Sequence, residues 1–360
     1  MASLSGEVMK QLRQTIIRAG LETLYLSGAH HVLRPIFAGV GTLFMLHHVR
    51  PARTDAFQPN RHLDITPEFL RETLAHVRDL GIDIISMDDM HRRLKERAFD
   101  RRFACFTFDD GYRDNHEFAY PVLKKYEVPF AIYVATSFAD RIGELWWLAL
   151  EAVIAQNDMV GVNIDGRDRW FECRSVKDKR EVYNYIYGWL RQLPAEEELR
   201  RAVRDLCARH RVDMAAFCAD LCMGWDELAA LAADPLVTIG AHTVNHPILT
   251  KLDDKAVRAE LGSSRSVIEA ALGVRPAHLA YPVGDRTAAG PREFRIANEL
   301  GFKTAVTTRP GVVFRKHAEH LTALPRISLN GNFQRARYAN VLISGAATGL
   351  WNGFRPVNVT

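Results

Sequence analysis

Short apolar runs alternate along this chain with longer stretches in which apolar residues recur every three or four positions. The short runs predict buried β-strands, and the longer stretches predict amphipathic helices. We expect strands at residues 41–46, 82–85, 103–108, 129–135, 237–241, 278–282 and 304–307. Repeated strand–helix units predict a parallel sheet with helices outside it, an α/β architecture closed into a barrel.

Residues 138–225 interrupt this alternation. Two strand-like segments around Val162 and Phe171 flank Asp165-Gly166, a dipeptide typical of a two-residue hairpin turn. Charged helical patterns follow as far as His210. We interpret this segment as a mostly helical insertion, which either covers the mouth of the barrel or forms an oligomer surface. The predicted division is an N-terminal helical segment (1–40), two barrel parts (41–137 and 226–329) around the insertion (138–225), and a tail (330–360).

Neither end of the chain has the pattern of a membrane span. Residues 1–19 have an amphipathic helical period without the uninterrupted apolar core of a secretory signal. The apolar stretch from Ile36 to Leu46 is too short to cross a bilayer, and we expect a buried strand there. A helix lying on a membrane surface is the alternative for the first segment. The tail has a weak helical pattern at residues 339–350.

Composition narrows the class of protein. The 360 residues are 48% hydrophobic and 25% charged, as in soluble globular proteins. The net charge of +4 is diffuse and no basic run is interleaved with aromatic residues, so we expect no nucleic-acid partner. The five cysteines are an odd number without a C-x-x-C motif, which favours reduced thiols and a cytoplasmic location.

Two adjacent carboxylates follow the predicted strand at residues 103–108. These are Asp109 and Asp110, and Gly111 comes next. In α/β folds, sites are built where strands end. The pair alone is equally consistent with a polar turn, because Asp-Gly is common turn chemistry. Another Asp pair, Asp88-Asp89, lies in a polar stretch before a helical pattern, and we interpret it as a solvated helix start.

Two histidines follow the predicted strand at residues 237–241. His242 and His246 are spaced i and i+4, which places both imidazoles on one side of a helical turn, close enough to bind one metal ion. Pro247 disfavours a longer helix, so we expect a single tight turn. Two surface histidines are the alternative. Two imidazoles and one carboxylate form the kind of set found in catalytic zinc and iron sites, and a second carboxylate beside them is a ready general base.

Together these residues resemble the motifs of the NodB-homology polysaccharide deacetylases, carbohydrate esterase family 4. The resemblance covers about residues 41–329, the insertion excepted. Its motifs are TFDDG at 107–111, HTVNH at 242–246, and the softer AYPVG at 280–284 and LPRI at 324–327. The resemblance implies a distorted (β/α) barrel with metal-dependent N-deacetylase activity.

The resemblance also implies a role for individual residues. Asp110, His242 and His246 are expected to bind a divalent metal, with Zn²⁺ the first choice and Co²⁺, Ni²⁺ or Fe²⁺ as alternatives. Asp109 is expected to be the general base. The backbone N–H of Tyr112 is expected to stabilise the oxyanion.

The last two assignments depend on a subgroup of the family. In permuted members, a strand near the N-terminus ends in a Tyr-His-x-Val pattern, and its histidine is the catalytic acid. The sequence LHHV at residues 46–49 is similar to this pattern. The resemblance therefore implies that His47 is the acid, with His48 as the alternative. Many members have an arginine where this chain has Ala280, whereas a subgroup shares the Ala-Tyr-Pro pattern. We expect Arg326 to supply the missing cation by pairing with Asp109.

The expected activity is therefore removal of N-acetyl groups from an N-acetylglucosamine-containing (chito)oligosaccharide or polysaccharide, with the glycan as the partner. Two alternatives stay open. One is a deacylase or deformylase of another amide, such as a lipid- or nucleotide-linked amino sugar. The other is a catalytically silent sugar-binding barrel on the same fold.

Overall fold

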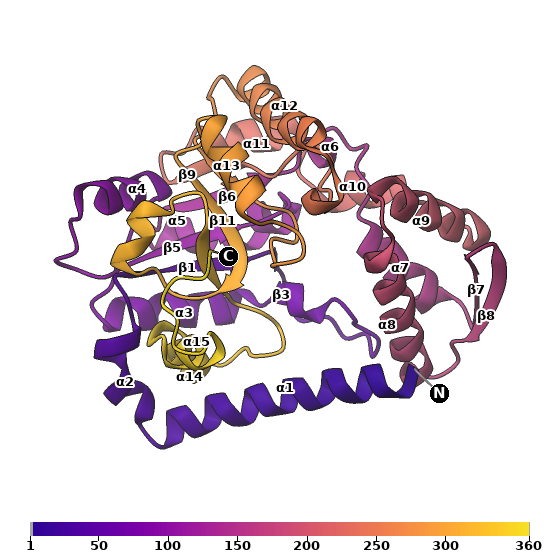
Figure 1. Ribbon diagram of the computed structural model, residues 1–360, viewed down its shortest axis with the longest axis horizontal. Helices are drawn as coiled ribbons and strands as arrows, with labels where there is room; N and C mark the ends of the chain where they lie inside the picture. The colour runs from indigo at the N-terminus through magenta and orange to yellow at the C-terminus, as the bar shows by residue number, and fades with distance from the viewer. Residues whose placement is uncertain (1–2, 360) are drawn as a thin grey trace.

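Seven parallel strands close into a barrel at the centre of the protein (Figure 1). The computed structural model describes residues 3–359, with the backbone alone for residues 3–11. Around the ring lie β1 (Gly41–Leu46), β12 (Leu324–Ser328), β11 (Thr304–Pro310), β10 (His278–Ala280), β9 (Val237–Ala241), β6 (Phe130–Val134) and β5 (Phe103–Phe108). The ring closes because β5 pairs with β1 from Gly41↔Phe103 to Leu46↔Phe108. The predicted α/β barrel is confirmed.

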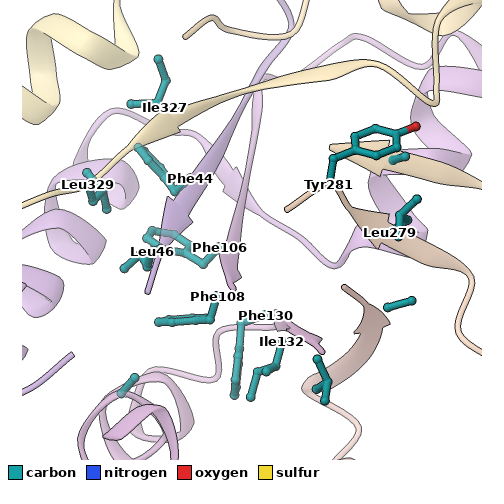
Figure 2. Packing of buried hydrophobic residues seen from close by; sticks show 14 of the residues in the cluster. Phe44, Leu46, Phe106, Phe108, Phe130, Ile132, Leu279, Tyr281, Ile327 and Leu329 are labelled. Carbon is teal, nitrogen blue, oxygen red and sulfur yellow. The ribbon is translucent and has the colours of Figure 1, made fainter. Parts of the chain in front are cut away.

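The strands are continuous apolar runs because both of their faces are buried. Phe106 and Phe108 of β5 point outward into the layer of helices, together with Phe44 and Ile132 of the neighbouring strands (Figure 2). Cys105 belongs instead to a second buried cluster, because successive side chains of a strand point to opposite faces. This pattern is typical of parallel sheets covered by helices.

Helices cover the outside of the ring. Their starts follow standard capping chemistry: Thr66 accepts a hydrogen bond from the N–H of Phe69, and Asp253 accepts one from the N–H of Ala256. The helices are α3 (Pro67–Asp79), α4 (Met87–Glu96), α5 (Tyr120–Lys125), α11 (Trp225–Ala232), α12 (Asp254–Leu272) and α13 (Pro291–Glu299). A short strand, β4 (Asp83–Ile84), pairs with β5 outside the closed ring.

The segment between β6 and α11 builds a second hydrophobic core beside the barrel. It contains α6 (Thr136–Ala139), α7 (Trp146–Gln156), β7 (Met159–Ile164), β8 (Arg167–Glu172), α8 (Val176–Gln192), α9 (Glu196–His210) and α10 (Met214–Leu221). The expected hairpin is present, since β7 and β8 pair antiparallel and their turn residues Asp165 and Gly166 both have positive φ, 53° and 75°. Figure 1 shows these helices on one side of the barrel.

The two ends of the chain pack together. A long helix, α1 (Ser3–Leu26), runs along the molecule and contacts both α14 (Ala336–Ile343) and α8 (Figure 1). The chain continues through α2 (Ala29–Phe37), and α15 (Ala346–Trp351) packs on α2. The expectation of one strand across residues 36–46 is wrong in its first part, because α2 extends to Phe37 and Gly39, at φ 58°, turns the chain before β1.

In the part of the chain that the structure describes, no helix is long and apolar enough to cross a membrane. All five cysteines are buried as free thiols.

Candidate metal centre and active-site cavity

The turn after β5 separates the two adjacent carboxylates. The backbone N–H of Asp109 donates to Leu46 O at 2.9 Å, which continues the β1–β5 ladder by one residue. Asp110 and Gly111 then adopt left-handed conformations, with φ of 71° and 69°. A left-handed conformation is unfavourable for a non-glycine residue, and such strain is concentrated at functional sites. The two acids therefore leave the strand in different directions.

His242 is fixed by hydrogen bonds at both its backbone and its ring. It follows β9, and its N–H donates to Val134 O at 2.9 Å. The ring Nδ1 donates to Ala280 O at 2.7 Å, so Nε2 is the nitrogen with a free lone pair. That Nε2 lies 3.4 Å from Asp110 Oδ1. A histidine oriented by a backbone carbonyl in this way is typical of metal ligands.

His246 reaches the same carboxylate from the following turn. Its backbone has φ 54°, and its N–H donates to the Thr243 hydroxyl at 3.0 Å. Its Nε2 lies 3.3 Å from Asp110 Oδ1. The ring is enclosed by Phe138 and Trp147, whose centroids lie 5.7 and 5.0 Å away. Burial lowers the pKa of His246 to about 3, so the imidazole is held neutral, the state in which it can bind a metal.

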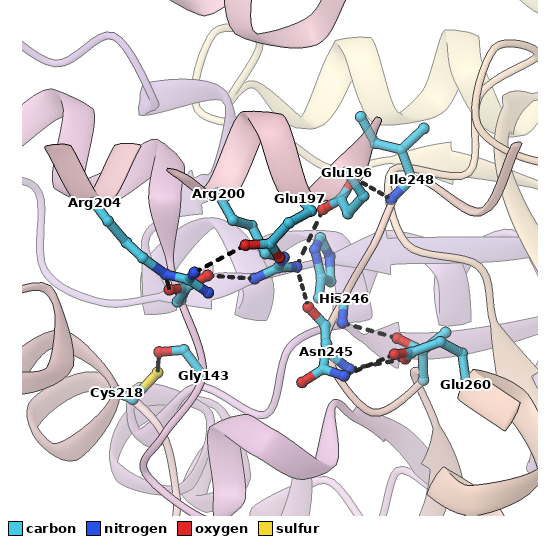
Figure 3. Close-up of polar contacts among 12 residues, drawn as sticks. Gly143, Glu196, Glu197, Arg200, Arg204, Cys218, Asn245, His246, Ile248 and Glu260 are labelled. Carbon is cyan, nitrogen blue, oxygen red and sulfur yellow. Dashed lines mark hydrogen bonds and ion pairs between the residues drawn. The ribbon is translucent and has the colours of Figure 1, made fainter. Parts of the chain in front are cut away.

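The loop that carries His246 is held from two sides by charged residues (Figure 3). Glu260 of α12 accepts the N–H groups of Val244 and Asn245, both at 2.9 Å. From α9, Arg200 donates to Asn245 O at 2.6 Å while it pairs with Glu196 at 3.1 Å. The sequence analysis missed these positioning residues, because they lie on helices that sequence alone does not place beside the loop.

The three donor groups converge on one point. One ligand atom each from Asp110, His242 and His246 lies within 4.8 Å of the others, and all three residues are buried. Burial opposes ionisation of Asp110, but the neighbouring imidazoles, His242 first, outweigh it and hold the pKa of Asp110 far below its usual range. Asp110 Oδ1 is buried without a hydrogen bond among the described residues. A carboxylate oxygen and two imidazole nitrogens aimed at one point fit a divalent metal ion.

Asp109 points into the barrel and meets Arg326 of β12. The guanidinium is bidentate, with Nη1 donating to Oδ1 at 2.7 Å and Nη2 donating to Oδ2 at 2.6 Å. Its Nε donates to Thr307 O and its Nη1 also to the Thr107 hydroxyl. Burial alone would raise the pKa of Asp109, but the Arg326 charge outweighs it and lowers that pKa below its ordinary value. The structure thus places Arg326 against the carboxylate with which it was predicted to pair.

The two histidines after β1 occupy different environments. His47 Nε2 lies 4.0 Å from Asp109 Oδ2, and the side chain lines the cavity described below. Burial lowers the pKa of His47, and the carboxylates of Asp109 and Asp110 oppose that shift. His48 turns away: its Nδ1 lies 2.6 Å from Asp114 Oδ2, and its ring is stacked on Tyr112 with centroids 3.6 Å apart.

Tyr112 follows the glycine of the turn. Its side chain is fully buried beneath His48, and burial raises the pKa of its hydroxyl well above the ordinary value. The segment is anchored because Met223 N–H donates to Gly111 O at 3.0 Å. The predicted contribution of Tyr112 is its backbone N–H, which lies one residue after the Asp-Gly turn.

These residues lie on the wall of one cavity of about 330 Å³. Its lining includes five of the predicted site residues, His47, Asp109, Asp110, His242 and His246. It also includes residues that were not predicted: Met45, Asn60, His62, Leu63, Trp146, Trp147, Tyr187, Val283 and Thr308. Nothing in the sequence places Trp147, at the start of the insertion, beside His246.

Comparisons with known proteins agree with this arrangement. A family model described as polysaccharide deacetylase matches residues 96–164 and 182–305, more than half of the chain. The chain belongs to the polysaccharide deacetylase family. Both matched ranges contain predicted metal ligands, Asp110 in the first and the two histidines in the second. The family resemblance is confirmed, whereas the subgroup with an N-terminal catalytic histidine stays a prediction.

Named members of the polysaccharide deacetylases are distant in sequence. YxkH of Bacillus subtilis (strain 168), whose name assigns it to this family, is 21% identical over 262 residues. That match covers 72% of this chain and 64% of YxkH, so the chain spans less than two thirds of its curated relative.

Solved structures show the same barrel. The Streptococcus pyogenes deacetylase PplD, in complex with acetate, superposes with a TM-score of 0.54 at 18% identity over 81% of this chain and 92% of its own. IcaB from Ammonifex degensii superposes with a TM-score of 0.51 at 17% identity, over 83% of this chain and 97% of its own. At these sequence identities, the structural similarity establishes the fold of this chain but not its substrate.

Proposed function

We propose that this polysaccharide deacetylase is a metal-dependent hydrolase that removes N-acetyl groups from an N-acetylglucosamine-containing glycan. The observation that carries the proposal is the convergence of Asp110, His242 and His246 beside an Arg-paired Asp109 in one cavity. Three ligands leave coordination positions for substrate, as catalytic sites require. The two adjacent acids then have separate tasks, one as ligand and one as base.

Each residue has a defined role in the proposed reaction. A divalent ion held by the Asp110 group would supply Lewis acidity for the acetamide carbonyl and lower the pKa of the attacking water. Asp109 accepts the proton of that water, and Arg326 keeps Asp109 ionised and oriented. The N–H of Tyr112 donates to the oxygen that becomes negative in the tetrahedral intermediate. His47 donates a proton to the departing amine, since an unprotonated amide nitrogen is a very poor leaving group.

The glycan substrate is proposed from the family. PplD is a deacetylase whose structure was solved with acetate, and the family model is named for polysaccharide deacetylation. A side wall of Trp146, Trp147 and Tyr187 also suits a sugar ring, because aromatic faces pack on the apolar side of pyranoses while hydroxyl groups bond to polar residues such as Asn60. Zn²⁺ is the first choice of metal, with Co²⁺, Ni²⁺ and Fe²⁺ also suited to two imidazoles and a carboxylate.

Acetate release tests the proposal directly. The protein is incubated with N-acetylglucosamine oligomers before and after treatment with a chelator, and after Zn²⁺ or Co²⁺ is added back. We expect acetate release that the chelator abolishes and the metal restores. One equivalent of bound metal without acetate from any oligomer would point to a different acyl amide. No metal binding at all would contradict the proposal and favour a silent sugar-binding barrel.

A further inference from the structure

A basic cleft of about 650 Å³ adjoins the active-site cavity. Its walls come from four separate parts of the chain: α1, the segment before β3 (Asp64–Ile65), α8 of the insertion, and Asn332 after β12. Asn60, His62 and Tyr187 line both the cleft and the cavity, so the two spaces share a wall. A molecule with its acetamide at the metal centre would extend past these residues into the cleft.

Four arginines line the cleft: Arg13, Arg18, Arg61 and Arg180. None of them forms an ion pair with a carboxylate of a described residue, and no described acidic residue lines the cleft. Three of them contact neutral groups: Arg18 donates to Asn332 O at 3.4 Å, Arg180 donates to Ala56 O at 3.3 Å, and Arg13 lies over the Trp351 ring at 5.0 Å.

Neighbouring arginines behave differently. Arg50 pairs with Asp64 at 2.8 Å, and Arg53 pairs with Glu151 at 2.8 Å. Among the described residues, these two arginines beside the cleft are therefore paired with carboxylates, whereas the four inside it are not. Guanidinium groups of this kind recognise phosphate oxygens by charge-assisted, often bidentate, hydrogen bonds.

We infer that the cleft binds a phosphoryl group attached to the amino sugar that is deacetylated. This inference rests on the proposed function and narrows its substrate class to an N-acetylated sugar joined to a phosphate or diphosphate. Two sources share that chemistry, a nucleotide diphosphate and a lipid diphosphate. A neutral chitooligosaccharide would leave the four charges unmatched.

Binding without turnover tests the cleft alone. Glucose 1-phosphate has no acetamide and methyl α-glucoside is its neutral match, and both are titrated into the metal-loaded protein by calorimetry. We expect glucose 1-phosphate to bind at least tenfold more tightly, and the double variant Arg61→Gln/Arg180→Gln to remove that difference. The control Arg174→Gln replaces an exposed arginine of the insertion that lies outside the cleft. Equal affinities for the two sugars in the unmodified protein would overturn the inference.

Turnover then identifies the source of the phosphoryl group. We compare kcat/KM for UDP-N-acetylglucosamine, a short prenyl diphosphate N-acetylglucosamine, and neutral N,N′-diacetylchitobiose. A preference of at least tenfold for either phosphoryl substrate, lost in the double variant, supports the inference and identifies the source of the phosphoryl group. A preference for N,N′-diacetylchitobiose overturns the inference. If no substrate is deacetylated, the proposed function fails while the glucose 1-phosphate titration still decides the cleft.

A second, independent observation concerns exposed apolar residues. In the described part of the chain, most large hydrophobic side chains that are exposed lie on α1, α2 and around α15. Examples are Ile16 at 60%, Leu26 at 77%, Val32 at 76%, Ile36 at 67%, Trp351 at 50% and Phe354 at 61%. These elements pack on one another, and Phe354 lies against Phe37 with ring centroids 5.7 Å apart. Exposed apolar side chains gathered on elements that pack together are typical of interaction surfaces.

Two arginines near these apolar residues indicate what kind of surface this face binds. Arg34 lies in α2 and Arg355 follows α15, and neither forms an ion pair among the described residues. An apolar helix face flanked by arginines is the pattern of a helix that lies in the interface of an anionic bilayer. We propose that α1, α2 and α15 form a face that docks on an anionic lipid membrane.

Vesicle sedimentation of the full chain tests this face. We expect binding to phosphatidylcholine vesicles with 30% phosphatidylglycerol and at least tenfold weaker binding to phosphatidylcholine alone. Val32→Asp and Ile16→Asp should each weaken sedimentation at least fivefold, whereas the matched Val274→Asp and Ile142→Asp, at equally exposed positions elsewhere, should not. Unchanged sedimentation in the first pair would overturn the proposal. So would a dimer that forms through this face in solution and binds no vesicles.

Discussion

The two walls of the active-site cavity differ in origin and in chemistry. One wall consists of strand ends: Asp109 and Asp110 follow β5, and His242 follows β9. The other comes from the insertion, where Trp146, Trp147 and Tyr187 present aromatic rings. In the proposed reaction, the charged groups on the barrel take part in bond making, while the aromatic wall binds the substrate. Changes in the first wall should therefore alter turnover, and changes in the second should alter affinity.

The largest effect is expected for the ligand residues. Asp110→Ala or His242→Ala removes one of the three groups that could bind the metal, and no other such group is found among the described residues. Bound metal and deacetylase activity should therefore be lost together. Metal content by mass spectrometry and acetate release measure the two losses. The control Asp89→Ala removes an acid from the Asp88-Asp89 pair in the first turn of α4, outside the cavity, and should leave both unchanged. An Asp110→Ala protein that keeps its metal would show that the ion is bound elsewhere.

The next largest effect distinguishes the role of Asp109 from that of Asp110. Asp109→Asn keeps the shape of the side chain but removes the charge that accepts a proton, so kcat should fall about a thousandfold while bound metal stays at one equivalent. Arg326 then lacks its buried carboxylate, and the free energy of unfolding should fall by about 3 kcal/mol. Denaturant titration measures that loss, and Asp89→Asn is the control. Loss of metal in Asp109→Asn would move this residue into the ligand set.

A smaller effect is expected for the residue proposed as the acid. His47→Ala should lower kcat about a hundredfold and retain the metal, since His47 lies beside Asp109 but outside the three ligands. His116→Ala, a histidine on the far side of the Asp-Gly turn, is the control. Near-full activity in His47→Ala would remove His47 from the mechanism. If only His48→Ala lost activity, His48 would be the acid, although its contacts with Asp114 and Tyr112 turn it away from the cavity.

The strand-end wall was predictable from sequence because its signals are local. Asp109 and His242 come directly after apolar runs, and the positive φ of Asp110 follows from a turn whose Asp-Gly sequence is visible. Six strands of the ring were predicted in the same way. The seventh, β12, was missed, since Pro325 and Arg326 interrupt its apolar pattern. Arg326 is tolerated inside the barrel because Asp109 and two backbone or hydroxyl oxygens satisfy it.

The insertion wall was not predictable, because its position depends on packing between distant segments. The helices of the insertion were recognised from their patterns, but the contact between Trp147 and His246 joins residues about one hundred positions apart. Asn60 is similar: it donates to Glu151 and accepts from Tyr183, so its place in the cavity wall is set by two helices of the insertion. Sequence patterns predict that such helices exist, not which residues they place at the site.

The smallest effect tests whether this second wall acts on binding alone. Tyr187 of α8 lines both the cavity and the basic cleft, with its ring stacked on Tyr183 at 5.7 Å. Tyr187→Ala removes contact area that substrate and transition state share, so KM should rise about fivefold while kcat stays within twofold. Tyr185→Ala on the same helix is the matched control, because Tyr185 packs on Phe171 outside the cavity. A fall in kcat without a change in KM would mean that the aromatic wall also positions the reacting groups, and the division between the two walls would no longer hold.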